Sequence, residues 1–244
     1  MQYRPENPLV VQSDRTLLLE TMGPHFAAAR DLLARFAELV KSPEYVHTYR
    51  LSPLSLWNAA SSGLDVEGVV AALHQWSKYP VPPDVPVWIR DIMGRYGRLE
   101  LTRDGDQLRL TADDPTRMAE VRSHRRVRPL LGAALDPTSS VVKVGDRGAL
   151  KQALVQAGHP VRDLAGFLDG DALDISLAGE GDTWELRRYQ RGAVEAFLAG
   201  PSGEGGSGVV VLPCGAGKTI VGIAAMASLG MKTLILCTNM IVLR

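Results

Sequence analysis

The sequence predicts a multidomain protein of mixed α/β and α+β class, and three observations support this. The β-branched run at 209–212 meets a Gly-rich turn that opens onto an apolar helix at 220–229, the order expected of one α/β unit. Ahead of it, residues 48–113 predict three helices followed by a β-hairpin. Between these segments, residues 130–168 predict a small α+β unit.

Composition limits the possible functions. The chain has 244 residues, enough for about two domains, and 45% of them are apolar. Lys+Arg and Asp+Glu both number 27, so any nucleic-acid contact must come from local basic patches. Cys214 and Cys237 lack metal-ligand spacing and suit a reducing, cytoplasmic setting. No signal peptide or membrane-spanning run is apparent, so we expect no membrane association.

The N-terminal residues predict strands and one helix. Residues 9–11 and 16–19 are short apolar runs on either side of a Ser13-Asp14 turn. From Phe26 to Val40 the apolar residues recur at helical spacing, which predicts an amphipathic helix over 26–40. We expect its apolar stripe to serve core packing alone.

Three further helices are delimited by capping signals. Ser52-Pro53 begins the first and Gly63 ends it. The second covers 66–76, and Asp84 is predicted to cap the third, which ends near Gly97. Alternating apolar residues at 99–101 and 108–110, around a turn at 103–106, predict a hairpin.

Three helices followed by a hairpin is the outline of a winged helix, a fold that can place its third helix in a major groove. Arg90, Arg95 and Arg98 would lie on or beside that helix. The alternative is a winged helix used for protein contacts, with solvated arginines, because Asp91 and Glu100 dilute the positive field. Both interpretations stay open.

The most basic run of the chain lies at 117–128. Such a cluster can neutralise phosphates, and the alternative is a solvated linker. Its basic residues are Arg117, Arg122, His124, Arg125, Arg126 and Arg128. After Pro129, residues 130–135 and 141–144 predict strands, and a helix is expected from Asp146 to Gly158.

The turn at 213–219, Pro-Cys-Gly-Ala-Gly-Lys-Thr, predicts a phosphate-binding loop. Gly215 and Gly217 allow backbone N–H groups to point at phosphate oxygens, Lys218 can reach the β- and γ-phosphates, and the Thr219 hydroxyl can bind Mg²⁺. The strict P-loop motif has Gly where Leu212 stands. The shorter Gly-x-Gly-Lys-Thr form is typical of superfamily-two helicases. The alternative is an ordinary Gly turn between strand and helix.

The ordered set of motifs resembles the XPB DNA repair helicases, prokaryotic branch. The first motor domain is matched by Leu186-Arg187-x-Tyr189-Gln190, the loop at 208–219 and Thr233-Leu-Ile-Leu-Cys-Thr-Asn239. Segments at 9–14, 47–54, 95–99 and 163–167 resemble that family's N-terminal region. The resemblance therefore covers nearly the whole chain.

The resemblance implies roles and boundaries that spacing alone does not give. Arg187 and Gln190 match the Q-motif positions that read adenine, with Tyr189 nearby, and a Gln amide offers both a donor and an acceptor to a base edge. Thr238 and Asn239 match the start of motif Ia, beside the DNA backbone. Implied domains are 1–125, an N-terminal domain with a winged-helix-like part at about 48–113; 126–175, resembling a damage-recognition domain; 176–182, a linker; and 183–244, the incomplete start of a RecA-like motor domain.

The implied activity is ATP-dependent 3′-to-5′ DNA translocation and unwinding in nucleotide excision repair. Its cofactors would be ATP and Mg²⁺, and its partners DNA and a repair nuclease or other repair proteins. Pro213, Cys214, Gly215 and Ala216 would line the nucleotide together with Gly217, Lys218 and Thr219. The basic residues Arg122, Arg125, Arg126 and Arg128 would add DNA contacts.

Phosphoryl transfer also needs a carboxylate for Mg²⁺ and a cationic finger, and the 244 residues contain no apolar strand followed by Asp-Glu. We therefore expect a fragment of a helicase that is inactive by itself. Its C-terminal strands, 209–212 and 232–236, would be poorly ordered or leave exposed apolar edges. The alternative function is a non-catalytic DNA- or protein-binding adaptor with a vestigial P-loop.

Overall fold

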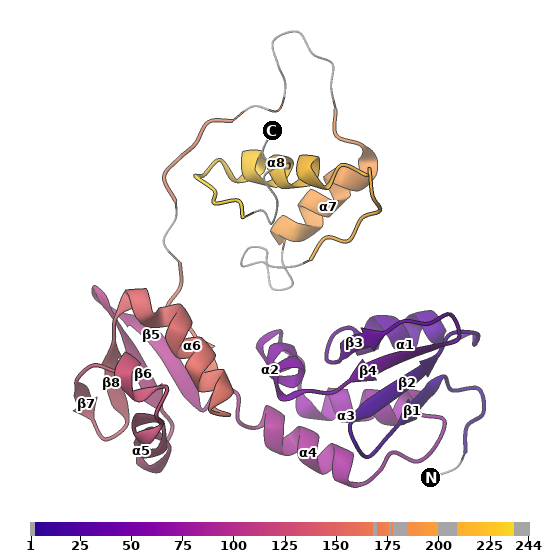
Figure 1. The fold of residues 1–244 in the computed structure, drawn as a ribbon, viewed down its shortest axis with the longest axis horizontal. Helices are drawn as coiled ribbons and strands as arrows, with labels where there is room; N and C mark the ends of the chain where they lie inside the picture. Colours follow the sequence, from indigo (N-terminus) through magenta and orange to yellow (C-terminus); the bar gives the residue numbers. More distant parts are fainter. Residues whose placement is uncertain (1–2, 168–169, 176, 178–184, 200–208, 237–244) are drawn as a thin grey trace. The chain divides into compact units, whose positions relative to one another are not determined.

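The computed structural model describes residues 3–167, 170–175, 177, 185–199 and 209–236. The chain divides into two compact units, Met1–Gly166 and Phe167–Arg244, which Figure 1 draws in indigo to salmon and in orange to yellow. Among the described residues, the first unit contains one antiparallel sheet and one mixed sheet. The phosphate-binding loop predicted from the sequence lies in the second unit.

The first sheet has the strand order β1-β2-β4-β3, and all its pairings are antiparallel. Its strands are β1 (Leu9–Val11), β2 (Thr16–Glu20), β3 (Glu38–Lys41) and β4 (Val46–Arg50), and α1 (Phe26–Leu33) connects β2 to β3. The two predicted N-terminal strands are confirmed. The helix predicted over 26–40 is wrong beyond residue 33, because 38–41 pairs with β4 instead.

Three helices pack with this first sheet around one apolar core. They are α2 (Pro53–Ser61), α3 (Val66–Trp76) and α4 (Asp84–Met93), which confirms the predicted trio. The Ser52 side chain accepts a hydrogen bond from the Ser55 N–H and forms a capping box. Pro83, not Asp84, occupies the N-cap of α4. The Trp57 indole N–H donates to the Ile92 carbonyl at 2.8 Å and fixes α2 against α4.

The second sheet has the strand order β7-β8-β6-β5-β9, visible in magenta and salmon in Figure 1. Its strands are β5 (Leu99–Asp104), β6 (Gln107–Ala112), β7 (Ala134–Asp136), β8 (Ser139–Val142) and β9 (Val161–Asp163). Helices α5 (Pro115–Ser123) and α6 (Arg147–Gln156), with short 3₁₀ turns at Arg128–Leu130 and Val144–Asp146, complete this part.

The predicted hairpin exists, but it is not the wing of a winged helix. β5 pairs with β6 as expected, and in addition β6 pairs with β8, and β5 pairs in parallel with β9. The hairpin therefore forms the centre of the second sheet, and one core runs from Leu99 to Ala165. A boundary at 125/126 would cut through this core. The structure thus joins β5, β6 and α5 with the segment at 126–166.

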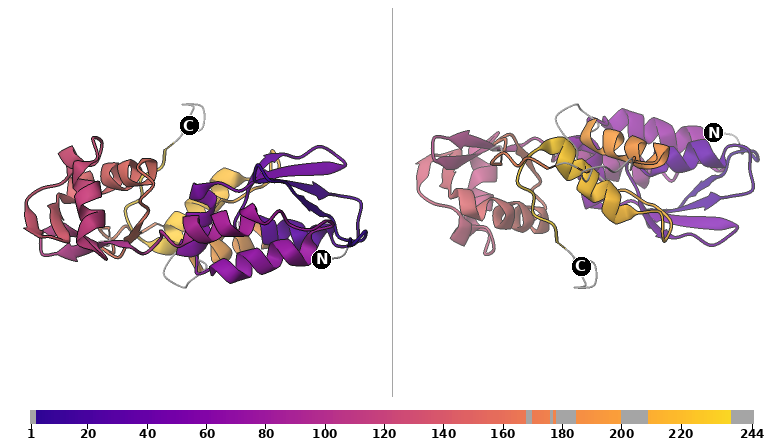
Figure 2. Two further views of the ribbon diagram at one scale, coloured as in Figure 1. Left: turned by 90° about the horizontal axis from the view of Figure 1, so that it is seen from below. Right: turned by 90° about the horizontal axis from the view of Figure 1, so that it is seen from above.

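The second unit contains α7 (Arg188–Ala199) and α8 (Lys218–Leu229), which lie against each other in both views of Figure 2. Val194, Val221 and Ala224 form its small buried core. Residues 170–173 pair with the chain just after α8: the Leu173 N–H donates to the Gly230 carbonyl at 2.8 Å and the Lys232 N–H to the Asp171 carbonyl at 2.8 Å. We call residues 170–173 and 230–232 together the α8 clip.

The two strands predicted beside the loop are wrong for the described residues. Neither 209–212 nor 232–236 is in a strand. Several of their side chains are exposed, with Val209 at 89% and Leu236 at 86%, whereas Val210 and Leu212 are partly buried against the small core of this unit. Without a partner strand among the described residues, these backbones have no ladder to join. The apolar exposure that the sequence predicted is present, but not as strand edges.

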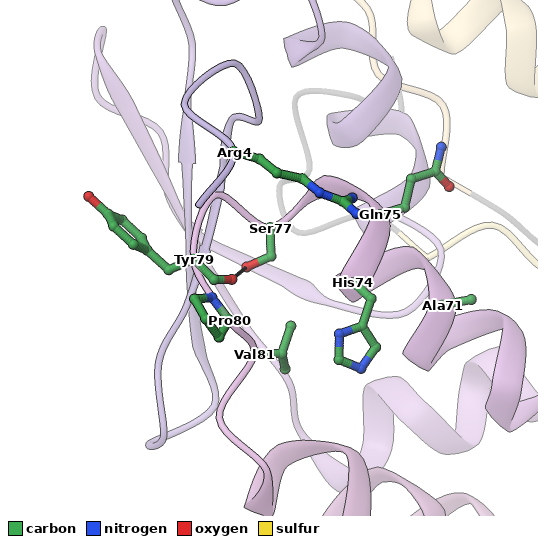
Figure 3. A pocket seen from close by; sticks show the side chains of 8 residues that line it. All are labelled: Arg4, Ala71, His74, Gln75, Ser77, Tyr79, Pro80 and Val81. Atoms are coloured by element: carbon green, nitrogen blue, oxygen red, sulfur yellow. Dashed lines mark hydrogen bonds between the residues drawn. The ribbon is translucent and has the colours of Figure 1, made fainter. Parts of the chain in front are cut away.

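A separate cavity of about 450 Å³ lies beside the C-terminal end of α3 and is drawn in Figure 3. His74 and Val81 line one side and the Arg4 side chain spans another. Asn7 Nδ2 donates to the Gln75 and Ser77 carbonyls at 2.7 and 3.0 Å, so the N-terminal residues are fastened to the end of this helix. None of the sequence-predicted site residues lines this cavity.

Candidate nucleotide-binding site

The loop at 213–217 adopts a backbone that requires glycine at two positions. Gly215 and Gly217 both have φ of +78°, in the left-handed region that L side chains rarely adopt. At Gly217 an added Cβ would also lie 2.7 Å from Gln190 Nε2. The glycine spacing read from the sequence is thus explained by backbone conformation at both positions and by close approach at the second.

The loop ends at the N-terminus of α8, which begins at Lys218 with Gly217 as its N-cap. No side chain of the described residues caps this terminus, and glycine has none to offer. The first N–H groups of a helix lack intrahelical partners, and the helix dipole makes this end electropositive. Thr219 is exposed in that first turn. The arrangement suits an anion such as a phosphate group.

The Lys218 side chain folds back over the loop. Its Nζ donates to the carbonyl oxygens of Leu212 and Pro213, both at 3.0 Å. These neutral acceptors hold the ammonium group above the loop, at the position from which it would meet a bound phosphate. A phosphate oxygen is the stronger acceptor for the Lys218 ammonium group, because it carries negative charge whereas both carbonyl oxygens are neutral.

Helix α7 brings the predicted adenine-reading residues to the same loop. Gln190 is 5% exposed, accepts from the Arg187 N–H at 3.0 Å and donates through Nε2 to the Ala216 carbonyl at 3.1 Å. The Tyr189 hydroxyl donates to the same carbonyl at 2.9 Å. The structure therefore brings together Arg187, Gln190 and the loop, as the sequence predicted.

These groups line a pocket of about 190 Å³. Two of its residues, Glu185 and Ile220, were missed from the sequence, although both are adjacent to predicted motifs. Glu185 places a carboxylate at this pocket beside Arg187. Cys214 is an exposed free thiol in the loop. The complete lining is Glu185, Arg187, Gln190, Gly215, Ala216, Gly217 and Ile220.

Among the described residues predicted to contact DNA, Arg122 is engaged within the fold, whereas Arg125, Arg126 and Arg128 are exposed. Arg122 is not free to contact DNA. Its guanidinium donates to the Asp136 carbonyl at 2.7 Å, the Ser139 carbonyl at 2.6 Å and Ser140 Oγ at 3.0 Å. It holds the β7–β8 turn against α5.

The other members of the basic run point elsewhere. Arg126 donates to the Gln156 side chain of α6, whereas Arg125 and Arg128 are exposed. Arg117 pairs with Asp113 at 2.6 Å. The predicted contacts at Thr238 and Asn239, and the second cysteine, Cys237, lie outside the described residues.

The described part of the chain has neither a metal-binding cluster nor a membrane-spanning helix. It contains no group of three or more His, Cys, Asp or Glu side chains placed to hold a metal ion. None of its helices has the length and apolar character that crossing a bilayer requires. Thr219, which the sequence motif predicts to bind Mg²⁺, lies in the first turn of α8.

Comparison with known proteins places both parts of the chain. The family model described as "Helicase conserved C-terminal domain" matches residues 9–136, and the model "Type III restriction enzyme, res subunit" matches residues 183–243. The first match covers more than half of the 244 residues. The second contains the phosphate-binding loop and α7.

Similar proteins carry the XPB name. The chain is 50% identical over 240 residues to "DNA 3'-5' helicase XPB" of Mycobacterium tuberculosis, covering 98% of this chain and 42% of that protein. The protein of the same name from Kineococcus radiotolerans is 51% identical over 96% of this chain and 41% of its own length. A more distant relative, 31% identical over 98% of this chain and 35% of its own length, is "General transcription and DNA repair factor IIH helicase/translocase subunit XPB" of Antonospora locustae.

The chain spans about two fifths of the length of the two bacterial relatives. The matches run through both compact units. The chain belongs to the XPB helicase family.

Proposed function

We propose that this chain forms the N-terminal part of an ATP-dependent DNA helicase or translocase that acts 3′-to-5′ in DNA repair. One observation carries the nucleotide half of the proposal: the glycine loop, the uncapped start of α8, Lys218 and Gln190 meet at one place. The names of the bacterial relatives support the DNA substrate and the direction. Family membership supports a RecA-like fold for the region from 183 onward.

Each site residue has a role that follows from its position. Backbone N–H groups from 214–219 bind the phosphates, and Lys218 exchanges its two carbonyl partners for phosphate oxygens. Thr219 holds Mg²⁺ through its hydroxyl. Arg187 and Gln190 contact the adenine edge, and Tyr189 keeps the Ala216 carbonyl in place. ATP and Mg²⁺ together supply the transferable phosphoryl group.

In this proposal the chain binds a nucleotide but does not hydrolyse it. Hydrolysis needs a carboxylate that holds Mg²⁺ and a cation that stabilises the transition state, and no Asp-Glu motif of that kind occurs in the 244 residues. We therefore expect this chain to bind ATP without turning it over. Residues of the longer relatives beyond the matched part would supply the missing groups.

We assign the DNA contacts to predicted residues that are still free to reach DNA. Arg125 and Arg128, both exposed, and Arg126 at the edge of α6 are proposed to bind DNA phosphates, and Thr238 and Asn239 are proposed to lie beside the backbone. A repair nuclease or another repair protein is the proposed protein partner, and the cytoplasm the proposed location.

The test of the nucleotide site is a titration of the purified chain with a fluorescent ATP analogue in the presence of Mg²⁺. We expect Lys218→Ala to weaken binding about tenfold or more, because the variant cannot form a hydrogen bond from a charged group to the phosphate. The matched control is Lys143→Ala, another exposed lysine, which should bind like the wild type. Equal binding by Lys218→Ala and the wild type would refute the site and favour the adaptor alternative.

A further inference from the structure

Four arginines from separate segments line one cavity of about 460 Å³ in the first unit. Arg90 and Arg95 come from α4 and the turn that follows it, Arg98 from the residues that lead into β5, and Arg117 from α5. Gly158 and His159 close the cavity from the segment after α6. We call this cavity the arginine pocket. Its remaining lining residues are Asp91, Gly94 and Glu120.

The arginine pocket is distinct from the basic run that the sequence emphasised. Only Arg117 belongs to both the pocket and the basic run. Elsewhere in the run, Arg122 is held by backbone carbonyls and Arg126 donates to a side chain of α6. The fold instead collects cations that are up to 27 positions apart in the chain, from Arg90 to Arg117. The sequence places Arg90, Arg95 and Arg98 on or beside one helix, and the fold adds Arg117 from α5.

Each guanidinium in the pocket has a carboxylate partner, but most of these pairs are exposed. Arg90 pairs with Glu67 at 2.8 Å with exposed fractions of 48% and 71%, and Arg95 pairs with Asp91 at 2.7 Å with 43% and 58%. Exposed ion pairs contribute little, because water and salt screen both charges. These carboxylates therefore hold the arginines in place weakly enough for a better anion to replace them.

Backbone atoms lie close to two of the guanidinium groups. Gly158 has φ of +81°, and an added Cβ there would lie 3.6 Å from the Arg95 guanidinium. Arg98 Nε donates to the Gly94 carbonyl at 2.7 Å, which orients the rest of that fork. The lining itself holds four arginines with Asp91 and Glu120, while Glu67, Asp113 and Asp114, which also pair with these arginines, are not among its lining residues. A bound phosphate would therefore replace carboxylates as the partner of the guanidinium groups.

We propose that the arginine pocket binds phosphate groups of a DNA backbone. Arginine forks match phosphate oxygens in a bidentate way. The cavity volume lies within the range of sites that hold a molecule of nucleotide size, about 300–1,000 Å³, rather than a single ion. The choice of DNA rests on the proposed function, whereas the phosphate chemistry rests on the arginines themselves. The contact is independent of sequence, because it reads only the backbone.

The first test compares two double variants of the full chain, without nucleotide, for binding to a fluorescein-labelled DNA duplex. The pocket pair is Arg90→Gln with Arg95→Gln. The control pair is Arg30→Gln with Arg109→Gln, two arginines outside the pocket that also pair with aspartates and are 47% and 43% exposed. Both pairs remove the same charge from equally exposed positions. Thermal melting checks that both fold.

Anisotropy measured between about 50 and 200 mM KCl gives the slope of log K against log salt. We expect the pocket pair to weaken binding and to lower the magnitude of that slope by about 1 for each phosphate that the variant no longer neutralises. The control pair should leave the slope unchanged.

A second test moves the affinity in the opposite direction. Asp91→Asn frees Arg95 from its carboxylate, so DNA should bind more tightly and with a steeper salt slope. Asp31→Asn frees Arg30 outside the pocket and adds the same net charge, and it should have a smaller effect. If Asp91→Asn and Asp31→Asn act equally, only net charge matters and the pocket is not a site.

The outcomes separate this inference from the proposed function. If the wild type binds DNA and the pocket pair binds like the control pair, the pocket assignment fails and the proposed function stands. If the wild type does not bind DNA, the pocket assignment and the DNA half of the proposed function fail, while ATP binding is still judged by Lys218→Ala. Replacing KCl with potassium phosphate at equal ionic strength adds a further arm. If phosphate binding depends on the pocket arginines but DNA binding does not, the site takes the free ion and the DNA assignment is overturned.

Discussion

Gln190 donates through Nε2 to the carbonyl oxygen of Ala216 at 3.1 Å, and a β-carbon on the next residue, Gly217, would lie 2.7 Å from the same nitrogen. The side chain that is predicted to read the base thus rests directly on the phosphate-binding loop. Any change in the loop backbone at 216–217 must move Gln190, and a change at Gln190 must alter the loop.

This contact makes Gly217→Ala a sharp test. The substitution forces an alanine into a left-handed conformation, which costs about 1–3 kcal/mol, and it displaces Gln190 Nε2. We expect nucleotide affinity to fall at least tenfold. The measurement is a titration with the fluorescent ATP analogue, read together with circular dichroism.

The matched control for Gly217→Ala is Gly222→Ala in the same helix. Nothing lies within 4 Å of a Cβ at Gly222 and its φ is ordinary, so alanine should stabilise α8 by about 1 kcal/mol and leave binding intact. If both variants bound nucleotide equally well, the loop conformation would not control the site.

Arg122→Ala should destabilise the first unit without a specific effect on DNA. The guanidinium satisfies the carbonyls of Asp136 and Ser139 and the hydroxyl of Ser140, and Ser139 and Ser140 are each 1% exposed. Leaving buried acceptors unpaired costs about 1–3 kcal/mol. Urea unfolding followed by tryptophan fluorescence measures this destabilisation.

Arg125→Ala removes a nearby exposed arginine and should leave the urea midpoint within experimental error. A fall in stability in Arg125→Ala as large as that in Arg122→Ala would mean that the carbonyl contacts of Arg122 do not support the β7–β8 turn.

His159 predicts a pH dependence of stability. Burial lowers the pKa of this imidazole, Glu120 opposes that shift, and the positive charges of Arg117, Arg95 and His124 lower the pKa further. A folded-state pKa below the ordinary 6.5 means that the unfolded chain binds the proton more readily, so stability falls as pH drops through about 6.5 and toward the lower folded value. Urea midpoints measured from pH 8 to pH 5 should show this decline.

His159→Gln should flatten that decline between pH 7 and pH 5, because glutamine does not titrate. The carboxylates Asp113, Asp136 and Asp163, whose pKa values are all lowered, remain charged over this range and do not contribute to it. An unchanged pH profile in His159→Gln would contradict the assignment to this histidine.

The apolar side chains after α8 predict self-association of this chain. Leu234 and Leu236 are 83% and 86% exposed, and exposed apolar surface promotes association. Replacing both with serine should lower light scattering at high protein concentration without lowering the melting temperature. The control is Leu135→Ser, at a 46% exposed position of β7. This variant should scatter light as much as the unmodified chain.

What the sequence could predict depended on whether the determining contacts are local. The loop from Gly215 to Thr219 was predictable because its glycines, lysine and helix start are consecutive. Gln190 was found through a family motif, and its contact with Ala216 crosses only 26 residues. The helices α2 to α4 have apolar stripes, and α2 and α3 also have side-chain caps, so their positions were predicted closely, although α4 ends at Met93, before the predicted Gly97.

Long-range pairing decided the features that were missed. The hairpin at 99–112 was predicted as a wing because its parallel partner, Val161–Asp163, lies about 60 positions later. Residues 38–41 continued the apolar spacing of a helix, but pairing with β4 overrides that local preference. Arg122 looked like an open cation because its acceptors are carbonyls of a turn, and no residue type marks them in the sequence.

Helix α8 has a fixed support at each end, and the α8 clip is the support at its C-terminal end. At its start, Gln190 and Tyr189 hold the loop through the Ala216 carbonyl. At its end, Gly230 and Lys232 are bonded to Leu173 and Asp171, and Lys232 Nζ adds an ion pair to Asp171 at 2.7 Å. Since a helix is stiff along its axis, a displacement imposed on Lys218 by an arriving triphosphate would be delivered to residues 170–173, the stretch of chain that closely follows the first unit.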